Sequence, residues 1–323
     1  MFLHAKKDAF CKDLRKKGEK MKKEIFQGAD GKEITLYVWD EVSSPVGVVQ
    51  LVHGMAEHAG RYADFAAYLN ENGLIVLADD HRAHGETDKD ALGLAYGDLF
   101  EDTVRDEQGI SALIRERYGL PLILMGHSYG SFLAQRYLSY GTEGLSGCVL
   151  MGSAAMEGPI VSLGAKIAAG KVKKGKGDEP GRFFAGQTFV KYDKKINDGV
   201  NGWLSRDKAQ VGKYNLDPLC SFACSNGFYD SFFRGLKAIW KDGGEKIGKD
   251  LPLLIVSGAC DGVGGYGKLT AKLRKRYERL GLTPEYKLFE GARHELLNET
   301  NREEVWAYLL DFFCKAAKNE KPA

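Results

Sequence analysis

The chain lacks any long hydrophobic run, because no apolar stretch in its 323 residues approaches the ~18 residues that a transmembrane helix requires. Its basic N-terminus is not followed by the ~7–15 apolar residues of a secretory signal, so none is predicted. A net charge of only +2 gives no overall indication of nucleic-acid binding. The remaining composition, 44% hydrophobic and 28% charged, is that of a globular protein large enough for one α/β domain or a core with a cap.

Cysteine is also scarce, with six residues scattered along the chain. Cys148 and Cys260 lie in or at the end of apolar, strand-like runs, where buried free thiols are common. Cys220 and Cys224 could share a helix face, but no second Cys/His pair stands nearby to complete a zinc site. We interpret all six as structural thiols in a reducing compartment, and we predict a cytoplasmic location.

The charge is unevenly distributed, since residues 1–24 hold nine Lys/Arg and four Asp/Glu. Apolar residues recur there at spacings of seven and four, as on one face of a helix: Leu3, Phe10, Leu14, Met21 and Ile25. Residues 1–24 are therefore predicted to form a basic helical extension. The sequence favours a solvated helix packed on the core. The alternatives are an amphipathic helix on an anionic membrane, and an upstream extension with Met21 as the physiological start.

Apolar runs alternate with segments of helical periodicity over most of the chain. Strands are predicted at residues 33–39, 46–52, 74–78, 120–125, 147–151, 251–257 and 286–289. Helices are predicted at residues 60–70, 101–118, 266–280 and 301–313, with another ending near residue 140. This alternation predicts an α/β fold with a mostly parallel central sheet flanked by helices on both faces.

The alternation breaks down over residues 153–240, which are rich in Gly, Lys and aromatics and contain no clear buried strand. We interpret this insertion as a mainly helical cap over the C-terminal edge of the sheet, where open α/β sheets bind ligands. It divides the core into residues 25–152 and 241–323. The cap lysines predict a solvated loop, with an anionic membrane or head group as the alternative partner. The cap aromatics predict an apolar tunnel suited to an acyl chain.

Residues 122–132 read as a buried strand, a sharp turn and the start of a helix. The turn, GHSYG at residues 126–130, carries the G-x-S-x-G pattern of a nucleophile elbow, which exposes a serine hydroxyl on a strained corner. Side chains at the two glycine positions would collide across so tight a corner. Ser128 is therefore the predicted nucleophile, and the rival serines Ser131 and Ser153 lack the elbow.

A serine hydroxyl needs a base to remove its proton, and that base needs a third group to orient it. His294 falls in the loop after the last predicted strand, and Asp261 lies just beyond the end of the preceding strand. The order Ser…Asp…His, each residue on a loop after a strand, is that of the α/β-hydrolases. The predicted triad is Ser128, Asp261 and His294, with Glu157 as the rival acid.

The tetrahedral intermediate of acyl transfer needs hydrogen-bond donors aimed at its oxyanion. The residue after the nucleophile supplies one backbone N–H, which here belongs to Tyr129. The loop after the strand at 46–52 should supply the second. His53 and Gly54 let the backbone turn sharply there, so Met55 N–H is the predicted donor.

Residues 53–62 carry the pattern H-G-x-x-E-H-x-x-R-Y, which resembles a segment of the monoacylglycerol lipase and lysophospholipase branch of the α/β-hydrolases. Residues 80–85 (DHRAHG) resemble that branch's D-x-R-G-H-G loop. Residues 203–207 and 217–220 resemble cap segments of its bacterial members. The resemblance spans about residues 24–313, and the capped family also resembles the serine aminopeptidases.

Two residues depart from the pattern of that branch. Ala83 replaces the usual glycine of the R-G-H-G loop, and we expect a slight shift of that loop. Gly262 replaces the proline often found after the acid, and we expect a looser loop around Asp261. Neither change removes a predicted catalytic group.

The remaining histidines form two spaced pairs that raise the hypothesis of a metal site: His53, His58, His81 and His84. The resemblance assigns them to the oxyanion loop and to a structural loop. No carboxylate-rich or Cys-rich motif completes a site, so neither a metal nor a cofactor is predicted.

The resemblance and the triad together imply a serine hydrolase that cleaves esters of lipids with one acyl chain through an acyl-serine intermediate. The expected partners are the lipid ester and, transiently, a membrane surface that contacts the N-terminus or the cap, with no nucleic acid. The alternatives are a short-chain carboxylesterase or aminopeptidase on the same scaffold, and a catalytically silent binding module. A peptidase should carry acids that hold a substrate amine, and the spacing of Glu157, Asp178 and Glu179 singles out none of them.

Overall fold

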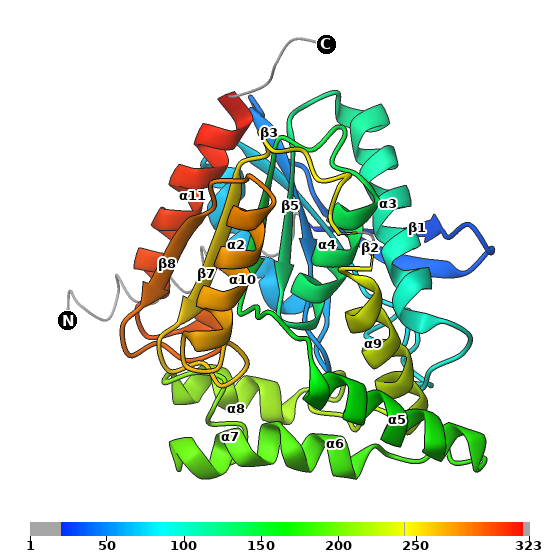
Figure 1. Cartoon of the computed structure of the whole chain (residues 1–323). Helices are drawn as coiled ribbons and strands as arrows, with labels where there is room; N and C mark the ends of the chain where they lie inside the picture. The colour runs from blue at the N-terminus through cyan, green and yellow to red at the C-terminus, as the bar shows by residue number, and fades with distance from the viewer. Residues whose placement is uncertain (1–20, 242, 319–323) are drawn as a thin grey trace, which may run out of the picture.

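A computed structural model describes residues 21–241 and 243–318 of the chain (Figure 1). Its strands are β1 (Lys22–Gln27), β2 (Glu33–Trp39), β3 (Gly47–Val52), β4 (Leu74–Asp79), β5 (Leu122–His127), β6 (Gly147–Met151), β7 (Leu253–Gly258) and β8 (Glu285–Phe289). They form one sheet in the order β1-β2-β4-β3-β5-β6-β7-β8. The β1–β2 and β2–β4 pairs are antiparallel, and the other neighbours are parallel.

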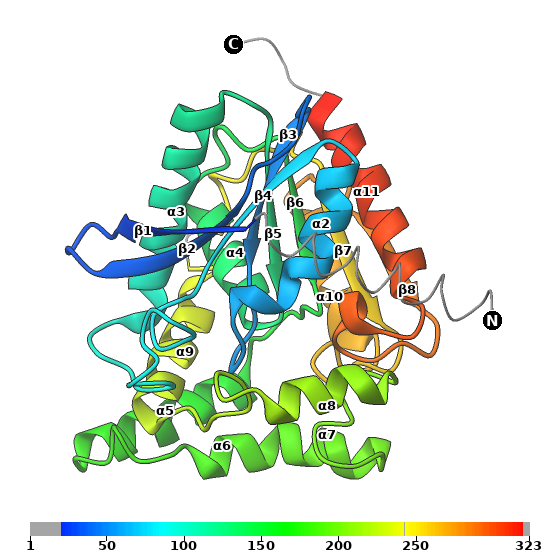
Figure 2. The ribbon, with the colours of Figure 1, turned by 180° about the vertical axis from the view of Figure 1, so that it is seen from behind.

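Helices cover both faces of this sheet. The core helices are α2 (Ala63–Glu71), α3 (Leu99–Tyr118), α4 (Tyr129–Tyr140), α10 (Lys268–Arg279) and α11 (Arg302–Lys318), with short 3₁₀ turns η2 (Ala59–Tyr62) and η3 (Leu296–Asn298). Figure 1 shows α3, α4 and α10 in front of the sheet, and Figure 2 shows α2 and α11 on the opposite face. The predicted mostly parallel sheet flanked by helices is therefore confirmed.

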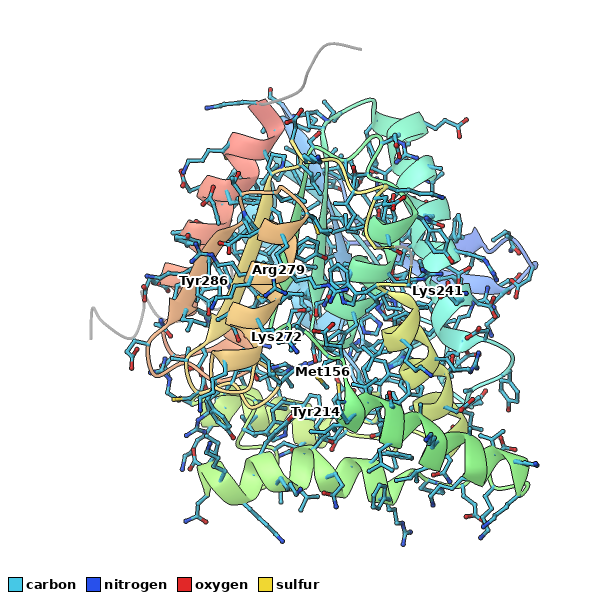
Figure 3. All side chains as sticks on the ribbon, in the orientation of Figure 1. Met156, Tyr214, Lys241, Lys272, Arg279 and Tyr286 are labelled. Carbon is cyan, nitrogen blue, oxygen red and sulfur yellow. The ribbon has the colours of Figure 1, made fainter. Side chains whose placement is uncertain are left out.

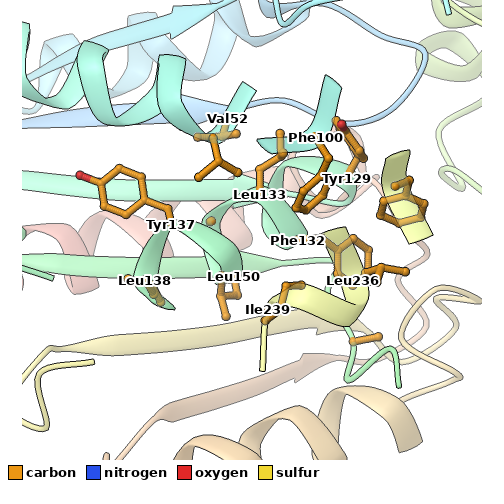
Figure 4. Close-up of a cluster of buried hydrophobic side chains, with 14 of the residues drawn as sticks. Val52, Phe100, Tyr129, Phe132, Leu133, Tyr137, Leu138, Leu150, Leu236 and Ile239 are labelled. Atoms are coloured by element: carbon orange, nitrogen blue, oxygen red, sulfur yellow. The ribbon is translucent and has the colours of Figure 1, made fainter. Parts of the chain in front are cut away.

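The central strands are buried along their whole length, which explains why their sequences are mostly apolar. Helices packed on each face leave no strand surface for water, so a polar alternation is not needed. One of the resulting apolar clusters joins α4 to α9 and includes Tyr129, Phe132 and Leu236 (Figure 4). It therefore connects the helix that follows the elbow with the inserted segment.

Five helices lie within the predicted cap. They are α5 (Pro159–Lys173), α6 (Arg182–Gln187), α7 (Phe189–Ile196), α8 (Lys208–Leu216) and α9 (Asn226–Ala238). Helices α5 to α8 lie below the carboxyl ends of the parallel strands in Figures 1 and 2. The site is therefore expected between these helices and the strand ends. Over the described part of the chain, no helix is both long and apolar enough to cross a membrane.

The first strand was not predicted. Residues 22–24, expected to end a basic helix, instead belong to β1, which pairs from Lys22 opposite Val38 to Gln27 opposite Glu33. The helical prediction is wrong there because β2 offers a free edge that satisfies the backbone of this segment. Exposed lysines mark it as an edge strand. Residues 1–20 of the predicted extension lie outside the described residues.

Candidate active site

Ser128 stands at the corner between β5 and α4. Its backbone has φ 52° and ψ −117°, a positive-φ conformation that strains any residue other than glycine. A Cβ at Gly126 would lie 2.4 Å from the carbonyl oxygen of Gly130, and one at Gly130 would lie 2.0 Å from that of Val52. Both glycines are required by this close approach, and the strand–turn–helix geometry expected of an elbow is present.

The two rival serines are engaged inside the core. Ser131 Oγ lies 2.6 Å from the carbonyl oxygen of Ser128 and 2.7 Å from Ser153 Oγ, and both hydroxyl-bearing side chains are buried. Gln135 Nε2 donates to Ser153 Oγ at 2.9 Å. These contacts support the backbone of the corner, so Ser131 and Ser153 have a structural explanation.

Asp261 and His294 meet in a buried hydrogen bond. His294 Nδ1 donates to Asp261 Oδ1 at 2.9 Å. The carboxylate also accepts from the Ser257 hydroxyl at 2.9 Å and from the Val263 amide at 2.8 Å. Burial alone raises the pKa of Asp261, but the charge of His294 and these hydrogen bonds hold it below its ordinary value. The carboxylate therefore stays ionised and fixes the orientation of the imidazole.

His294 lines the same cavity as Ser128. Its Nε2 atom is buried and has no hydrogen-bond partner among the described residues. The hydrogen bond to Ser128 that the predicted triad needs is therefore not formed in this structure. Catalytic hydrogen bonds are often long without substrate and shorten in the complex. The unpartnered Nε2 of His294 is therefore compatible with a general base that accepts a proton only when substrate is bound.

The rival acid, Glu157, lies elsewhere. Its carboxylate accepts from Arg276 at 2.8 Å and pairs with Lys272 at 2.9 Å, both on α10. The hydrogen bond from Lys272 is the main cause that lowers the pKa of Glu157. These contacts tie the loop after β6 to α10, and the carboxylate that contacts His294 is Asp261.

The loop after β3 brings one unused amide beside Ser128. Gly54 N donates to Glu57 Oε1 at 2.7 Å, whereas Met55 N donates to no described residue. A Cβ at Gly54 would lie 3.3 Å from Ser128 Cβ, and Met55 and Ser128 line the same cavity. Tyr129 is the first residue of α4, so its N–H has no acceptor within that helix. Both predicted oxyanion donors are thus adjacent to Ser128.

Two histidines fix the peptide that carries the Met55 amide. His53 Nδ1 donates to the Gly54 carbonyl at 2.8 Å, and its Nε2 accepts from the His81 amide at 3.1 Å. The Gly54 carbonyl and the Met55 N–H belong to one planar peptide, so holding the oxygen also sets the direction of the hydrogen. Burial lowers the pKa of His53 well below its ordinary value, which keeps the ring neutral as these two bonds require.

A buried ion-pair network, Glu57–Arg61–Glu295, joins this loop to the loop of His294. Arg61 contacts Glu57 and donates to the two carboxylate oxygens of Glu295 at 2.8 and 2.7 Å. It also lies 4.8 Å from the ring centre of Tyr214 in α8, which is labelled in Figure 3. The side chains are 11% exposed for Arg61 and 4% for each glutamate, so water screens them little. Sequence reasoning missed this network, whose only local signal is the four-residue spacing of Glu57 and Arg61.

Of the two departures from the family pattern, the one at Gly262 has a physical explanation. A Cβ at Gly262 would lie 2.5 Å from the Tyr192 ring of α7, so the glycine makes room for a cap side chain. Lys195 of the same helix lies 3.1 Å from the ring centre of Tyr266. The cap thus packs on the acid loop, and the expected loosening is not supported. Ala83 is buried with φ 64°, a conformation usually left to glycine.

Two clusters bring three ligand-type atoms within 4.8 Å of one another: Asp79, His81 and Glu107, and His58, Asp217 and Cys220. In the first, His81 Nδ1 bonds to Asp79 at 2.9 Å and Nε2 bonds to the His53 carbonyl at 3.1 Å. In the second, His58 Nδ1 accepts from the Gly60 amide, so its Nε2 carries the proton. Neither histidine has a lone pair free for a metal ion, and no metal site is proposed.

The cavity at Ser128 has two arms: a larger one that carries a few polar groups among mostly apolar walls, which we call the polar arm, and a smaller apolar arm. The polar arm, of about 210 Å³, is lined by Glu57, Asn201 and Ser221, and by Trp203, whose ring centre lies 4.8 Å from that of His294. The apolar arm, of about 60 Å³, also contains Ser128. Its six aromatic walls are Tyr129, Phe132, Phe189, Tyr192, Tyr229 and Phe232. A reacting ester at Ser128 can therefore place chemically different groups on its two sides.

Comparison with known proteins agrees with this geometry. A family model described as serine aminopeptidase, S33, matches residues 43–301. The chain is 27% identical over 277 residues to monoglyceride lipase of Homo sapiens, covering 84% of this chain and 82% of the relative. It is 30% identical over 287 residues to monoacylglycerol lipase of Mycolicibacterium smegmatis, covering 87% and 92%. A thermostable carboxyl esterase of Bacillus coagulans, solved with glycerol, superposes with a TM-score of 0.85 at 27% identity, covering 92% and 99%.

Proposed function

The chain belongs to the α/β-hydrolase family described as serine aminopeptidase, S33, and we propose that it is a serine hydrolase acting on lipids with one acyl chain, monoacylglycerols or lysophospholipids. Among its relatives are monoacylglycerol lipases and a carboxyl esterase, and the chain is a carboxylic ester hydrolase. One observation carries the proposed mechanism. It is the buried Asp261–His294 pair, 2.9 Å apart, whose free Nε2 belongs to the cavity that contains Ser128.

In the proposed reaction, Ser128 Oγ attacks the ester carbonyl carbon while His294 Nε2 takes its proton. Asp261 holds the imidazole in the required tautomer and stabilises its charged form. The Met55 and Tyr129 amides donate to the oxyanion of the tetrahedral intermediate. His294 then returns the proton to the leaving alcohol oxygen, and the acyl-serine remains. A water activated by His294 attacks that ester and releases the fatty acid.

The two arms of the cavity support a substrate with one acyl chain. The aromatic walls of the apolar arm suit an alkyl chain, whose burial is favourable by about 0.8 kcal/mol for each methylene. The polar arm offers Asn201 and Ser221 to the hydroxyl groups of an alcohol such as glycerol. The printed names of the human and mycobacterial relatives, monoglyceride and monoacylglycerol lipase, support the same substrate class.

An aminopeptidase activity is less well supported. It needs a carboxylate free to hold the substrate amine. Glu57 and Glu295 line the polar arm, but Arg61 already pairs with both. Glu157 pairs with α10, and Glu179 pairs with a neighbouring lysine at 3.3 Å. These four glutamates therefore have partners, and Asp178 is exposed at the surface, which favours an ester over a peptide substrate.

We also propose that the cap contacts a lipid surface transiently. Ile160 and Leu163 on α5 are 85% and 59% exposed, and Phe183 on α6 and Val190 on α7 are 46% and 47% exposed. Lysines accompany these apolar side chains on the same helices and the adjoining loop: Lys166, Lys171, Lys173, Lys174, Lys176, Lys191, Lys194 and Lys195. Apolar and basic side chains together favour binding to an anionic lipid surface.

A cytoplasmic location is proposed from the thiols. The five described cysteines are free, and burial raises the pKa of Cys148, Cys220 and Cys224. These three thiols therefore stay protonated and unreactive, as is typical of a reducing compartment.

The test is release of fatty acid from a monoacylglycerol, a lysophosphatidylcholine and 4-nitrophenyl butyrate by the wild type and by Ser128→Ala. We expect turnover of at least one lipid and its loss in the variant. Turnover of the aryl ester alone would replace the lipid assignment with a short-chain carboxylesterase. Hydrolysis of aminoacyl 4-nitroanilides in place of esters would identify an aminopeptidase. A folded wild type with no turnover would favour the silent module.

A further inference from the structure

Met156 lies at the boundary between two separate cavities. It lines the apolar arm together with Ser128, and it also lines a second cavity at the surface. Figure 3 labels Met156 above α5, between Lys272 on α10 and Lys241 beyond α9. Among the residues that line these two cavities, Met156 is the one that they share. Met156 therefore borders both cavities.

The second cavity, which we call the outer cavity, lies between α5 and α9. Its apolar walls are Val161, Leu236 and Trp240, and Ser162 stands at its α5 side. Its volume is about 250 Å³, several times that of the apolar arm. A cavity of about 60 Å³ is far below the ~300–1,000 Å³ of ordinary ligand sites, so the apolar arm alone is too small for a long acyl chain.

The polar groups of the outer cavity do not oppose an alkyl chain. The charge of Glu157 is compensated by Lys272 and Arg276, which hold its carboxylate at 2.9 and 2.8 Å. Lys237 and Lys241 stand at the rim. Long lysine side chains can line an apolar wall with their stems while the ammonium groups stay in water.

The side chain of Met156 is able to move while its backbone is held. Its amide donates to the Ala154 carbonyl at 3.2 Å, and the next residue, Glu157, is anchored to α10. The side chain is only partly buried and has three rotatable bonds, the feature that lets methionine adapt to irregular spaces. The side chain of Met156 can therefore change rotamer without a movement of its backbone.

We propose that Met156 is a movable partition that sets the acyl-chain length, and that the methyl end of a long acyl chain displaces it and enters the outer cavity. The inference rests on the proposed function, because the acyl group must first be attached at Ser128. Short acyl chains end within the apolar arm and leave the partition closed. The partition therefore determines specificity and takes no part in the chemistry.

The experiment compares kcat/KM for 4-nitrophenyl butyrate and 4-nitrophenyl laurate, both below their aggregation concentrations. Each additional methylene of the acyl chain that becomes buried against apolar walls should raise kcat/KM about fourfold. Removing the partition in Met156→Ala should raise the laurate-to-butyrate ratio at least fourfold, and Met156→Trp should lower it at least fourfold. Ser162→Trp fills the outer cavity from its far side and should also lower the ratio. Ala169→Trp adds the same bulk to an exposed position of α5 and should not change it.

Affinity for free fatty acid gives a second readout that needs no turnover. Calorimetry on the Ser128→Ala protein, with and without Met156→Trp or Ser162→Trp, should show weaker binding of decanoate in the double variants and unchanged binding of butyrate. If the wild type hydrolyses neither ester, the proposed function fails and these affinities alone decide the question. Ratios within twofold of the wild type in the Met156 variants or in Ser162→Trp, with equal decanoate affinities, would overturn the partition.

Discussion

Replacing Arg61 should leave two buried carboxylates, those of Glu57 and Glu295, without the positive charge that compensates them. In the Glu57–Arg61–Glu295 network, the guanidinium contacts one glutamate and bonds both oxygens of the other at 2.8 and 2.7 Å. Breaking a buried ion pair by deleting one partner costs about 3–5 kcal/mol, because the remaining charge is left uncompensated. Arg61→Met keeps much of the side-chain volume and should therefore lower the free energy of unfolding by about that amount. The matching fall in Tm is about 4–7 °C for a chain of this size.

The pH dependence identifies the cause of this loss. Burial alone raises the pKa of Glu57, but the charge of Arg61 and the contact with His127 lower it well below its ordinary value. A carboxylate with a depressed pKa stabilises the fold above its unfolded pKa and loses that contribution as the pH falls through its folded pKa. Without Arg61, burial dominates and Glu57 is protonated at a higher pH. The difference between wild type and variant should be full at pH 8 and smaller at pH 5.

The assay is urea unfolding followed by circular dichroism at both pH values. Arg117→Met is the matched control, since Arg117 also bonds a glutamate, Glu24, through two nitrogens at 3.1 and 2.7 Å, but at the surface. That change should cost about 0–1 kcal/mol. An Arg61→Met variant no less stable than the control, or a loss that grows at pH 5, would refute the reasoning.

The other predictions concern the site itself. Gly130→Ala should leave no correctly folded, active enzyme, because its Cβ would stand 2.0 Å from a carbonyl oxygen; soluble yield and ester turnover check this. Asp261→Asn should lower kcat about 10⁴-fold by favouring the wrong tautomer of the base, whereas Glu157→Gln should leave kcat within about twofold. A large loss of kcat in Glu157→Gln with little loss in Asp261→Asn would reverse the choice of acid. Gly262→Ala should lower kcat/KM by displacing Tyr192, and Tyr192→Leu should restore part of it; additive effects in this double-mutant cycle would contradict the contact.

The parallel part of the fold could be predicted because its strands are buried on both faces. Runs such as residues 47–52 and 122–127 are almost continuously apolar, and the periodicity of the helices between them is clear. Strand β1 was not predicted, because its sequence, KKEIFQ, is polar and exposed, as is typical of an edge strand. It is a strand only because it pairs with β2, which its own sequence does not reveal. The individual cap helices were not predicted, although α7 and α9 are amphipathic, because glycines and short loops interrupt the segment and no buried strand separates its helices.

The part of the candidate site that could be predicted consists of residues that directly follow a core strand, because the strands themselves are recognisable in the sequence. The order of Ser128, Asp261 and His294 along the chain depends on the sheet topology, so the sequence is enough to choose them, and their catalytic roles stay predictions. The link between Arg61 and Glu295 spans 234 residues and has no sequence pattern. The position of Met156 between two cavities likewise depends on how α5 and α9 pack, which composition does not encode.

The most direct test of the acyl-serine mechanism is covalent labelling with a fluorophosphonate, located by peptide mass spectrometry. The account predicts one label per chain, on Ser128, with none in Ser128→Ala and much slower labelling in His294→Ala. Attachment at Ser131 or Ser153, or no labelling of a folded wild type, would contradict it.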